Sequence, residues 1–250
     1  MKTVERFSDR VANYVKYRPT YPPEVLAFFR SELGLTRSSI LADIGSGTGI
    51  SSRLFVENGN VVYGVEPNAA MRAAAEELFR EFENFKSVDG TAESTGLAAA
   101  STDFVIAAQA FHWFDRAAAR AEFKRILRPG GYAALIWNER QLDSTSFLRE
   151  YEEFISKNGK DYREVRHENI TDEVLESFFG HEFGQQSFEN DQVLDFEGLK
   201  GRMASSSYMP SETDPEFERV ADELRALFDK HQEQGRIVIQ YDTKIYFSHL

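Results

Sequence analysis

A short apolar run that ends in a glycine-rich loop constrains this chain more than any other feature of its sequence. Residues 40–44, Ile-Leu-Ala-Asp-Ile, have the composition of a strand that is buried on both faces of a parallel sheet. The loop that follows, residues 45–49 (Gly-Ser-Gly-Thr-Gly), leads into a helix expected over residues 51–58. Glycines allow such a turn to be tight, and they allow a ligand to approach the backbone at the N-terminal end of the helix. A nucleotide-like ligand is therefore expected at the carboxyl end of this strand.

Segments typical of strands and helices alternate along the first 140 residues. Asn68 and Asp115 have side chains suited to cap two of the intervening helices. Residues 128–131, Arg-Pro-Gly-Gly, are expected to form a turn. The alternation predicts an α/β fold with a doubly wound, mostly parallel sheet that helices cover on both faces. The five predicted strands are residues 40–44, 61–65, 85–88, 104–108 and 132–137.

The pattern changes after residue 139. Residues 140–190 are rich in Glu, Phe and Arg and are expected to form irregular helices, followed by helices over 195–208 and 215–234. Strand-like alternation returns at residues 237–241 and 244–247. We interpret the chain as a single domain, 1–250, with four parts: an N-terminal lid and first helix (1–35), a cofactor-binding core (36–139), a helical cap and substrate region (140–235) and a closing strand region (236–250).

The composition narrows the class of partner. The 250 residues include 41 acidic and 29 basic side chains, so the net charge is −12, which argues against nucleic acid or an anionic membrane as a partner. The lack of cysteine excludes a disulfide scaffold, a thiolate metal site and a cysteine nucleophile. No apolar run approaches the roughly 20 residues of a membrane helix, and the first residues lack the apolar stretch of a secretory signal. A cytoplasmic protein is predicted, with no metal because its histidines are scattered.

The glycine loop departs from the dinucleotide-binding fingerprint. That fingerprint, G-x-G-x-x-G, requires its third glycine at position 50, where this chain has Ile50 and places Gly49 one residue early. Glu66, at the end of the second predicted strand, stands about where a ribose-binding acid is expected. Both nicotinamide and S-adenosylmethionine sites use such an acid. Glu66 therefore indicates a ribose and leaves the cofactor open.

Several motifs in order resemble those of class I S-adenosylmethionine-dependent methyltransferases, in particular the methyltransferase type 11 and trans-aconitate methyltransferase-like branch. The similarity extends over roughly residues 5–138. It implies a Rossmann-like seven-stranded sheet with an N-terminal helical lid and a helical cap insertion. It also implies methyl transfer from S-adenosyl-L-methionine to a small-molecule acceptor. The motifs are residues 17–22 (Tyr-Arg-Pro-Thr-Tyr-Pro), 43–49 (Asp-Ile-Gly-Ser-Gly-Thr-Gly), 90–93 (Gly-Thr-Ala-Glu), 109–114 (Gln-Ala-Phe-His-Trp-Phe) and 127–131 (Leu-Arg-Pro-Gly-Gly).

The resemblance also implies roles for individual residues. Arg18 would pair with the carboxylate of the cofactor's methionine part, for which its bidentate fork is suited. Glu66 would bind the ribose hydroxyls. Further cofactor contacts would come from Asp43, Gly45, Ser46, Gly47, Pro67, Asn68, Thr91, Ala92 and Gln109. Acceptor contacts are expected from Tyr14, Tyr17, Phe111 and Trp113, and His112 is the one candidate for a catalytic base, needed only if the acceptor must lose a proton.

Two other functions fit the same residues. One is an NAD(P)-dependent reductase of the same sheet class, disfavoured by Ile50 and by the lack of a Tyr-x-x-x-Lys pair in the first 140 residues. The other is a non-catalytic, cofactor-binding interaction module. The sequence specifies neither the acceptor nor the oligomeric state.

Overall fold

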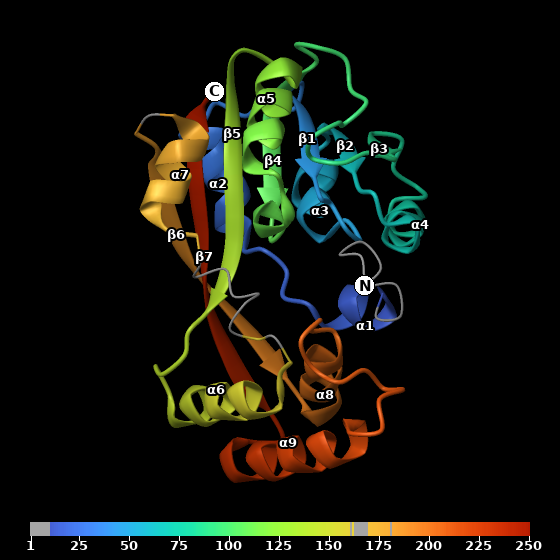
Figure 1. Ribbon diagram of the computed structural model, residues 1–250, viewed down its shortest axis with the longest axis vertical. Coiled ribbons are helices and arrows are strands. Elements are labelled where there is room, and N and C mark those ends of the chain that lie inside the picture. Colours follow the sequence, from blue (N-terminus) through green and yellow to red (C-terminus); the bar gives the residue numbers. More distant parts are fainter. Residues whose placement is uncertain (1–10, 161, 163–169, 181) are drawn as a thin grey trace.

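A computed structural model describes residues 11–160, 162, 170–180 and 182–250 (Figure 1). Its centre is a seven-stranded sheet with the order β3-β2-β1-β4-β5-β7-β6. The first five strands are parallel, and β7 and β6 are antiparallel additions at one edge. The doubly wound, mostly parallel α/β prediction is thus confirmed. The strands are β1 (Ile40–Ile44), β2 (Val61–Val65), β3 (Phe85–Val88), β4 (Thr102–Ala108), β5 (Leu127–Arg140), β6 (Gly184–Leu194) and β7 (Ile237–His249).

Helices cover both faces of the parallel part of the sheet. One face packs against α5 and α7, whose buried side chains include Phe123 and Phe178. The opposite face packs against α2 and α3, which bury Phe29 and Phe55. Asn68 and Asp115 cap α4 and α5 through backbone N–H groups, as their positions predict. The helices are α1 (Val11–Tyr17), α2 (Pro23–Ser31), α3 (Ile50–Glu57), α4 (Ala69–Leu78), α5 (Arg116–Ile126), α6 (Ser146–Asn158), α7 (Asp172–Phe179), α8 (Phe196–Ala204) and α9 (Phe217–His231), with a 3-10 turn, η2, at Phe111–Trp113.

A second block, the cap, lies beyond the carboxyl ends of the parallel strands. It consists of α6, α8 and α9 packed on the far halves of β6 and β7, at the lower end of Figure 1. Its hydrophobic core is separate from the two cores beside the sheet and contains Leu148, Leu199, Leu224 and Ile239. Strand β7 has 13 residues, a length of about 44 Å, and therefore reaches from the sheet into the cap.

The edge of the sheet differs from the sequence prediction. The two closing strands expected at 237–241 and 244–247 are one strand, β7, which continues through Asp242 and Thr243. The remaining strand, β6, begins in the segment 140–190, for which irregular helices are predicted, and ends at Leu194. Its side chains alternate between partly buried and exposed. Among the described strands it pairs with β7 alone, at the edge of the sheet. A strand of this kind lacks the apolar run by which buried strands are recognised.

Two smaller differences concern residues 128–131 and α7. Residues 128–131 are not a separate turn before β5. They lie within the strand, where the β4–β5 register shifts between the pairs Thr102–Leu127 and Phe104–Tyr132. Helix α7 falls within the predicted cap range, but it packs beside α5 on the sheet because Leu175 and its neighbours bury their apolar side chains there.

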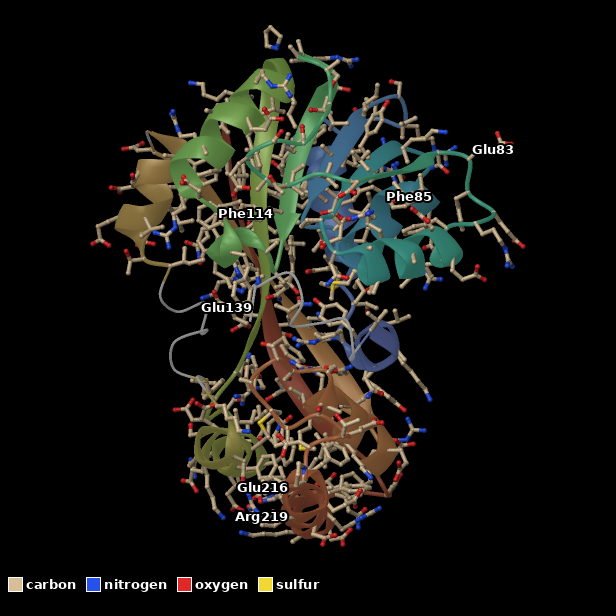
Figure 2. The ribbon with its side chains drawn as sticks, turned by 45° about the vertical axis from the view of Figure 1, so that its right-hand side comes forward. Glu83, Phe85, Phe114, Glu139, Glu216 and Arg219 are labelled. Carbon is tan, nitrogen blue, oxygen red and sulfur yellow. The ribbon has the colours of Figure 1, made fainter. Side chains whose placement is uncertain are left out.

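A buried amide joins the sheet to the cap-bearing strands. Asn138 is 6% exposed, and its Nδ2 donates to the carbonyl of Thr20 over 3.2 Å. Its Oδ1 accepts hydrogen bonds from Thr243 Oγ1 at 2.6 Å and from Asn190 Nδ2 at 3.2 Å. Figure 2 shows the neighbouring Glu139 at the narrow region between the two blocks. Asn138 thus connects β5, β6, β7 and the segment that follows α1.

Replacing Thr243 with Val tests this connection. The side chains have nearly the same shape, but Val cannot donate to Asn138, so Thr243→Val should lower the free energy of unfolding by about 1–3 kcal/mol. Urea denaturation measures the change, with Thr213→Val as a control because Thr213 is exposed. Equal, negligible effects of both substitutions would contradict the stabilising role of the hydrogen bond.

Candidate functional site

The glycine loop closes tightly over the carboxyl end of β1. Gly45 has φ +70°, and a Cβ at this position would lie 2.6 Å from the Cβ of Ala110. The backbone N–H groups of Gly45 and Ser46 donate to the carbonyl of Val65 at the end of β2, over 2.8 and 3.2 Å. Both the backbone conformation and the lack of space require glycine at position 45. The loop is therefore held at the point where the sheet and α3 meet.

Asp43 holds the first turn of α3. Its carboxylate is fully buried and accepts hydrogen bonds from the hydroxyls of Ser51 at 2.6 Å and Ser52 at 2.7 Å. Burial raises the pKa of Asp43 to about 6, although both hydroxyls act to lower it. Asp43 thus fixes the start of α3, directly after the glycine loop, and it does not line the cavity.

Glu66 ties the end of β2 to the same loop. Its carboxylate accepts hydrogen bonds from the N–H of Gly47 at 3.0 Å and the N–H of Asn68 at 2.8 Å. Burial raises the pKa of Glu66, while the two N–H groups and Arg72 oppose the increase. Each carboxylate oxygen has a second lone pair with which to accept from a ligand hydroxyl.

A cavity opens between the glycine loop and the cap. Its walls come from the glycine loop, the end of β4 with η2, the segment around α1, and the cap with the far part of β7. Lining residues from these four regions include Gly45, Ser46 and Gly47; Gln109, His112 and Trp113; Tyr14 and Arg18; and Tyr162, Arg202, Tyr208 and Tyr241. Segments far apart in the sequence thus meet at the carboxyl edge of the sheet, where α/β folds place their ligands.

Gln109 marks the end of β4 with an unusual backbone conformation. Its φ is +57°, a region that residues other than glycine rarely adopt. Its N–H donates to the carbonyl of Ile136 at 2.9 Å, and its Nε2 donates to the carbonyl of Asn138 at 3.3 Å. The surrounding hydrogen bonds hold this conformation against its strain and leave Gln109 on the cavity wall.

The cavity brings together only part of the predicted cofactor set. Arg18, Gly45, Ser46, Gly47 and Gln109 line it. The others lie outside its wall, at or next to the ends of β1, β2 and β3: Asp43, Glu66, Pro67, Asn68, Thr91 and Ala92. Glu66 is connected to the cavity through its hydrogen bond to Gly47, whereas Ala92 is buried beside the sheet.

Of the residues predicted to contact the acceptor or act on it, Tyr14, His112 and Trp113 line the cavity, but Phe111 and Tyr17 do not. Phe111 is fully buried and packs edge-on against Trp137 and Phe178, so its apolar ring belongs to the sheet core. The ring of Tyr17 covers Gly201 of α8, where a Cβ would lie 2.1 Å from it. Tyr17 therefore packs α1 against the cap. The first ten residues of the predicted lid lie outside the described residues.

The sequence analysis missed the cap side of the cavity. Arg140, Tyr162, Arg202, Tyr208 and Tyr241 all line it. Arg140 ends β5 and could have been found by extending the rule that strand ends carry functional side chains. The others carry no motif. Tyr162 follows α6, Arg202 and Tyr208 lie in and after α8, and Tyr241 lies on β7, so the packing of the cap brings them to the cavity.

Arg18 is suited to hold an anionic group in this cavity. The side chain reaches the cavity wall from the segment after α1, and its Nη2 donates to the carbonyl of Ser205 at 2.8 Å. Its buried Nε has no hydrogen-bond partner among the described residues. The unpartnered donor and the backbone of the glycine loop fit a ligand that carries a carboxylate beside a nucleoside.

Two absences hold for the described residues alone. No group of three or more His, Asp or Glu side chains gathers as a metal site would require. No described helix has the length and apolar character to cross a membrane.

Comparison with known proteins points to one activity. A family model described as "Methyltransferase domain" matches residues 42–135. The chain is 27% identical over 252 residues to an uncharacterized methyltransferase-like protein of Schizosaccharomyces pombe, covering 98% of this chain and 95% of that one. It is 36% identical over 162 residues to an uncharacterized methyltransferase of Mycobacterium tuberculosis, covering 63% and 62%.

Solved structures share the fold. A protein from Anaeromyxobacter dehalogenans assigned as a type II methyltransferase matches with a TM-score of 0.69 and 23% identity, over 93% of this chain and 98% of that one. A protein from Anabaena variabilis, assigned as a methyltransferase from an antibiotic biosynthesis pathway, matches with a TM-score of 0.62 and 21% identity, over 95% and 100%. These comparisons favour methyl transfer over the reductase and the non-catalytic module. They do not distinguish the trans-aconitate methyltransferase-like branch from others.

Replacing Asp43 with Asn tests whether burial raises the pKa of the Asp43 carboxyl. Because its pKa in the folded chain is raised to about 6, protonation contributes stability that is fully present below pH 3.8 and is lost as the pH rises through about 6. The stability of the wild type relative to Asp43→Asn should therefore fall across this range and level off above it. Urea denaturation at several pH values measures the difference. The exposed Asp143→Asn is the control, and a pH-independent difference for Asp43→Asn would show that the carboxyl is not perturbed.

Proposed function

Because the chain is a class I S-adenosylmethionine-dependent methyltransferase, we propose that it methylates a small-molecule acceptor in the cavity between the sheet and the cap. The observation that carries this proposal is the composition of the cavity wall. The glycine loop and the end of β4 form one side, and cap residues form the other. A cofactor on the first side and an acceptor on the second would share one enclosed space.

The cofactor side of the proposal assigns a task to each group near the loop. Arg18 would bind the carboxylate of the methionine part through its unpartnered Nε. Glu66 would accept hydrogen bonds from the ribose hydroxyls while it continues to hold the N–H of Gly47. Pro67, Asn68, Thr91 and Ala92, near the ends of β2 and β3, would border the adenine. Gly45, Ser46 and Gln109 would line the methionine side.

When bound, S-adenosylmethionine supplies an electrophilic methyl group on a sulfonium centre, so the protein need not activate the methyl donor. What the chain's residues contribute is position and the exclusion of water. Holding two reactants in line lowers the barrier by up to about 7–11 kcal/mol. Tyr14 and Trp113 would form apolar walls, and His112 would take a proton from an acceptor that must lose one.

Incubation with methyl-labelled S-adenosylmethionine and pooled metabolites tests the function. Transfer of label to a metabolite supports the proposal and identifies the acceptor. Binding of the cofactor without transfer to any pool would instead favour the non-catalytic module. A cytoplasmic location and a lack of nucleic-acid partners remain predictions drawn from the acidic composition.

The Glu66→Ala variant tests the ribose contact. It removes hydrogen bonds to a charged acceptor, each worth about 1.5–3 kcal/mol, so the affinity for S-adenosylhomocysteine should fall by about 10- to 100-fold. Isothermal titration calorimetry measures the affinity. Glu77→Ala, on the exposed face of α4, is the matched control and should bind normally. Unchanged affinity in Glu66→Ala would remove this residue from the proposed site.

Limited proteolysis tests whether α1 acts as a lid. Lys16 is exposed on α1, two residues before Arg18, so a cofactor held by Arg18 should slow trypsin cleavage after Lys16. Cleavage after the exposed Arg236, at the junction of α9 and β7, should not change. Equal cleavage rates at Lys16 with and without S-adenosylhomocysteine would mean that α1 is a fixed part of the wall.

A further inference from the structure

The cap side of the cavity is rich in buried positive charge. Arg140 and Arg202 line it, and Arg18 lines the cavity from the segment that follows α1. The side chain of Arg140 is only 10% exposed, and Arg202 as a residue only 8%. Of the lining residues that the structure describes, none is Asp or Glu. The chain as a whole has a net charge of −12, yet basic side chains gather here. Buried charges are normally paired, so the partners of these arginines need to be accounted for.

The three guanidinium groups share very little compensating negative charge. Arg140 contacts the carboxylate of Glu152 through Nη2, and the same atom donates to the hydroxyl of Tyr162 at 3.2 Å. Its buried Nη1 has no hydrogen-bond partner within the described part of the chain.

The partners of Arg202 that the structure describes are neutral. Its Nε donates to the hydroxyl of Tyr241 at 3.3 Å, and its Nη1 donates to the hydroxyl of Ser206 at 2.9 Å. One carboxylate, that of Glu152, thus contacts the set of three described arginines.

The pKa of the neighbouring Tyr208 is consistent with this charge. Burial acts to raise it, but Arg202, Arg18, a hydrogen bond with Ser206 and Arg140 together outweigh burial and leave the pKa below its ordinary value. The cavity therefore has a positive potential on its cap side.

The cofactor does not neutralise this potential. S-adenosylmethionine carries a sulfonium, an ammonium and one carboxylate, so it adds positive charge overall. Its single carboxylate is matched to Arg18 in the proposed function. That leaves Arg202, whose described partners are neutral, and the unpartnered Nη1 of Arg140 for another anion. Removing water from Arg202 without such an anion would be unfavourable.

We propose that Arg140 and Arg202 form an anion subsite of the cap that binds a carboxylate of the methyl acceptor. The inference rests on the proposed function and adds the substrate class: a small organic acid. The planar, bidentate guanidinium group matches a carboxylate. The unpartnered Nη1 of Arg140 is a free donor for one. The assignment concerns the group that is bound, whichever atom receives the methyl group.

Thermal unfolding of the S-adenosylhomocysteine-saturated protein tests the subsite. The probes are glutarate and its neutral counterpart glutaramide, at equal concentration and with the ionic strength matched by sodium chloride. Glutarate should raise the Tm by at least about 2 °C because a ligand of the folded state stabilises it, and glutaramide should not. Equal responses to the two probes would overturn the proposal, as would a rise with inorganic phosphate but not with glutarate.

Substitutions at Arg140 and Arg202 test whether these two residues cause the increase in Tm. Arg202→Gln and Arg140→Gln should each abolish the rise caused by glutarate, and Arg140→Lys, which keeps the charge without the fork, should retain part of it. Arg149→Gln, exposed on α6, is the matched control and should respond as the wild type does. Two separate positions keep the test decisive if one variant does not fold. A full rise in a folded Arg140→Gln variant would overturn the assignment.

Calorimetry with S-adenosylhomocysteine separates this proposal from the one on which it rests. A wild-type chain that does not bind S-adenosylhomocysteine would contradict the cofactor site. A chain that binds it, but responds equally to glutarate and glutaramide, would contradict the anion subsite alone.

Discussion

The antiparallel pairing of β5 with β7 is the contact on which the site depends. It continues in unbroken register from the pair Tyr132–His249, inside the sheet, to Arg140–Tyr241, at the cavity. Beyond that point β7 continues its pairing with β6 as far as Ile237, and its residues Ile237 and Ile239 belong to the cap core. Because backbone hydrogen bonds set the register residue by residue, the cap is held at a defined position relative to the glycine loop.

Buried groups of opposite charge lie on the two sides of the cavity, the acidic ones behind its wall and the basic ones in it. Under the sheet wall, Asp43 and Glu66 are buried carboxylates held by hydroxyl and N–H donors. The cap wall has buried arginines, most of whose described partners are neutral oxygens. The fold keeps the two sets apart by placing them on different blocks of the chain, where each set has its own supporting hydrogen bonds.

Local patterns predicted the sheet half of the molecule well. Strands β1 to β4 and the capped helices α4 and α5 follow from apolar runs and from Asn68 and Asp115, which act over a few residues. Strand β6 could not be recognised in this way. Its polar, alternating side chains are those of an edge strand, and β7 contains the polar pair Asp242 and Thr243 because Thr243 is satisfied by Asn138 across the sheet. A polar residue in a strand looks like a break until its distant partner is known.

The sequence by itself determined the α/β class, the glycine loop at the end of β1 and the acid that follows β2, because each depends on neighbouring residues and on backbone conformations that few residue types adopt. Tertiary structure alone decided which side chains share the cavity. Phe111 is buried in the core, and Tyr17 packs on α8. Arg202 and Tyr241, about 60 to 100 residues beyond Arg140, line the same cavity as the glycine loop. The physical reason is that their positions depend on the long β5–β7 pairing and on the packing of the cap, which are contacts between distant parts of the chain.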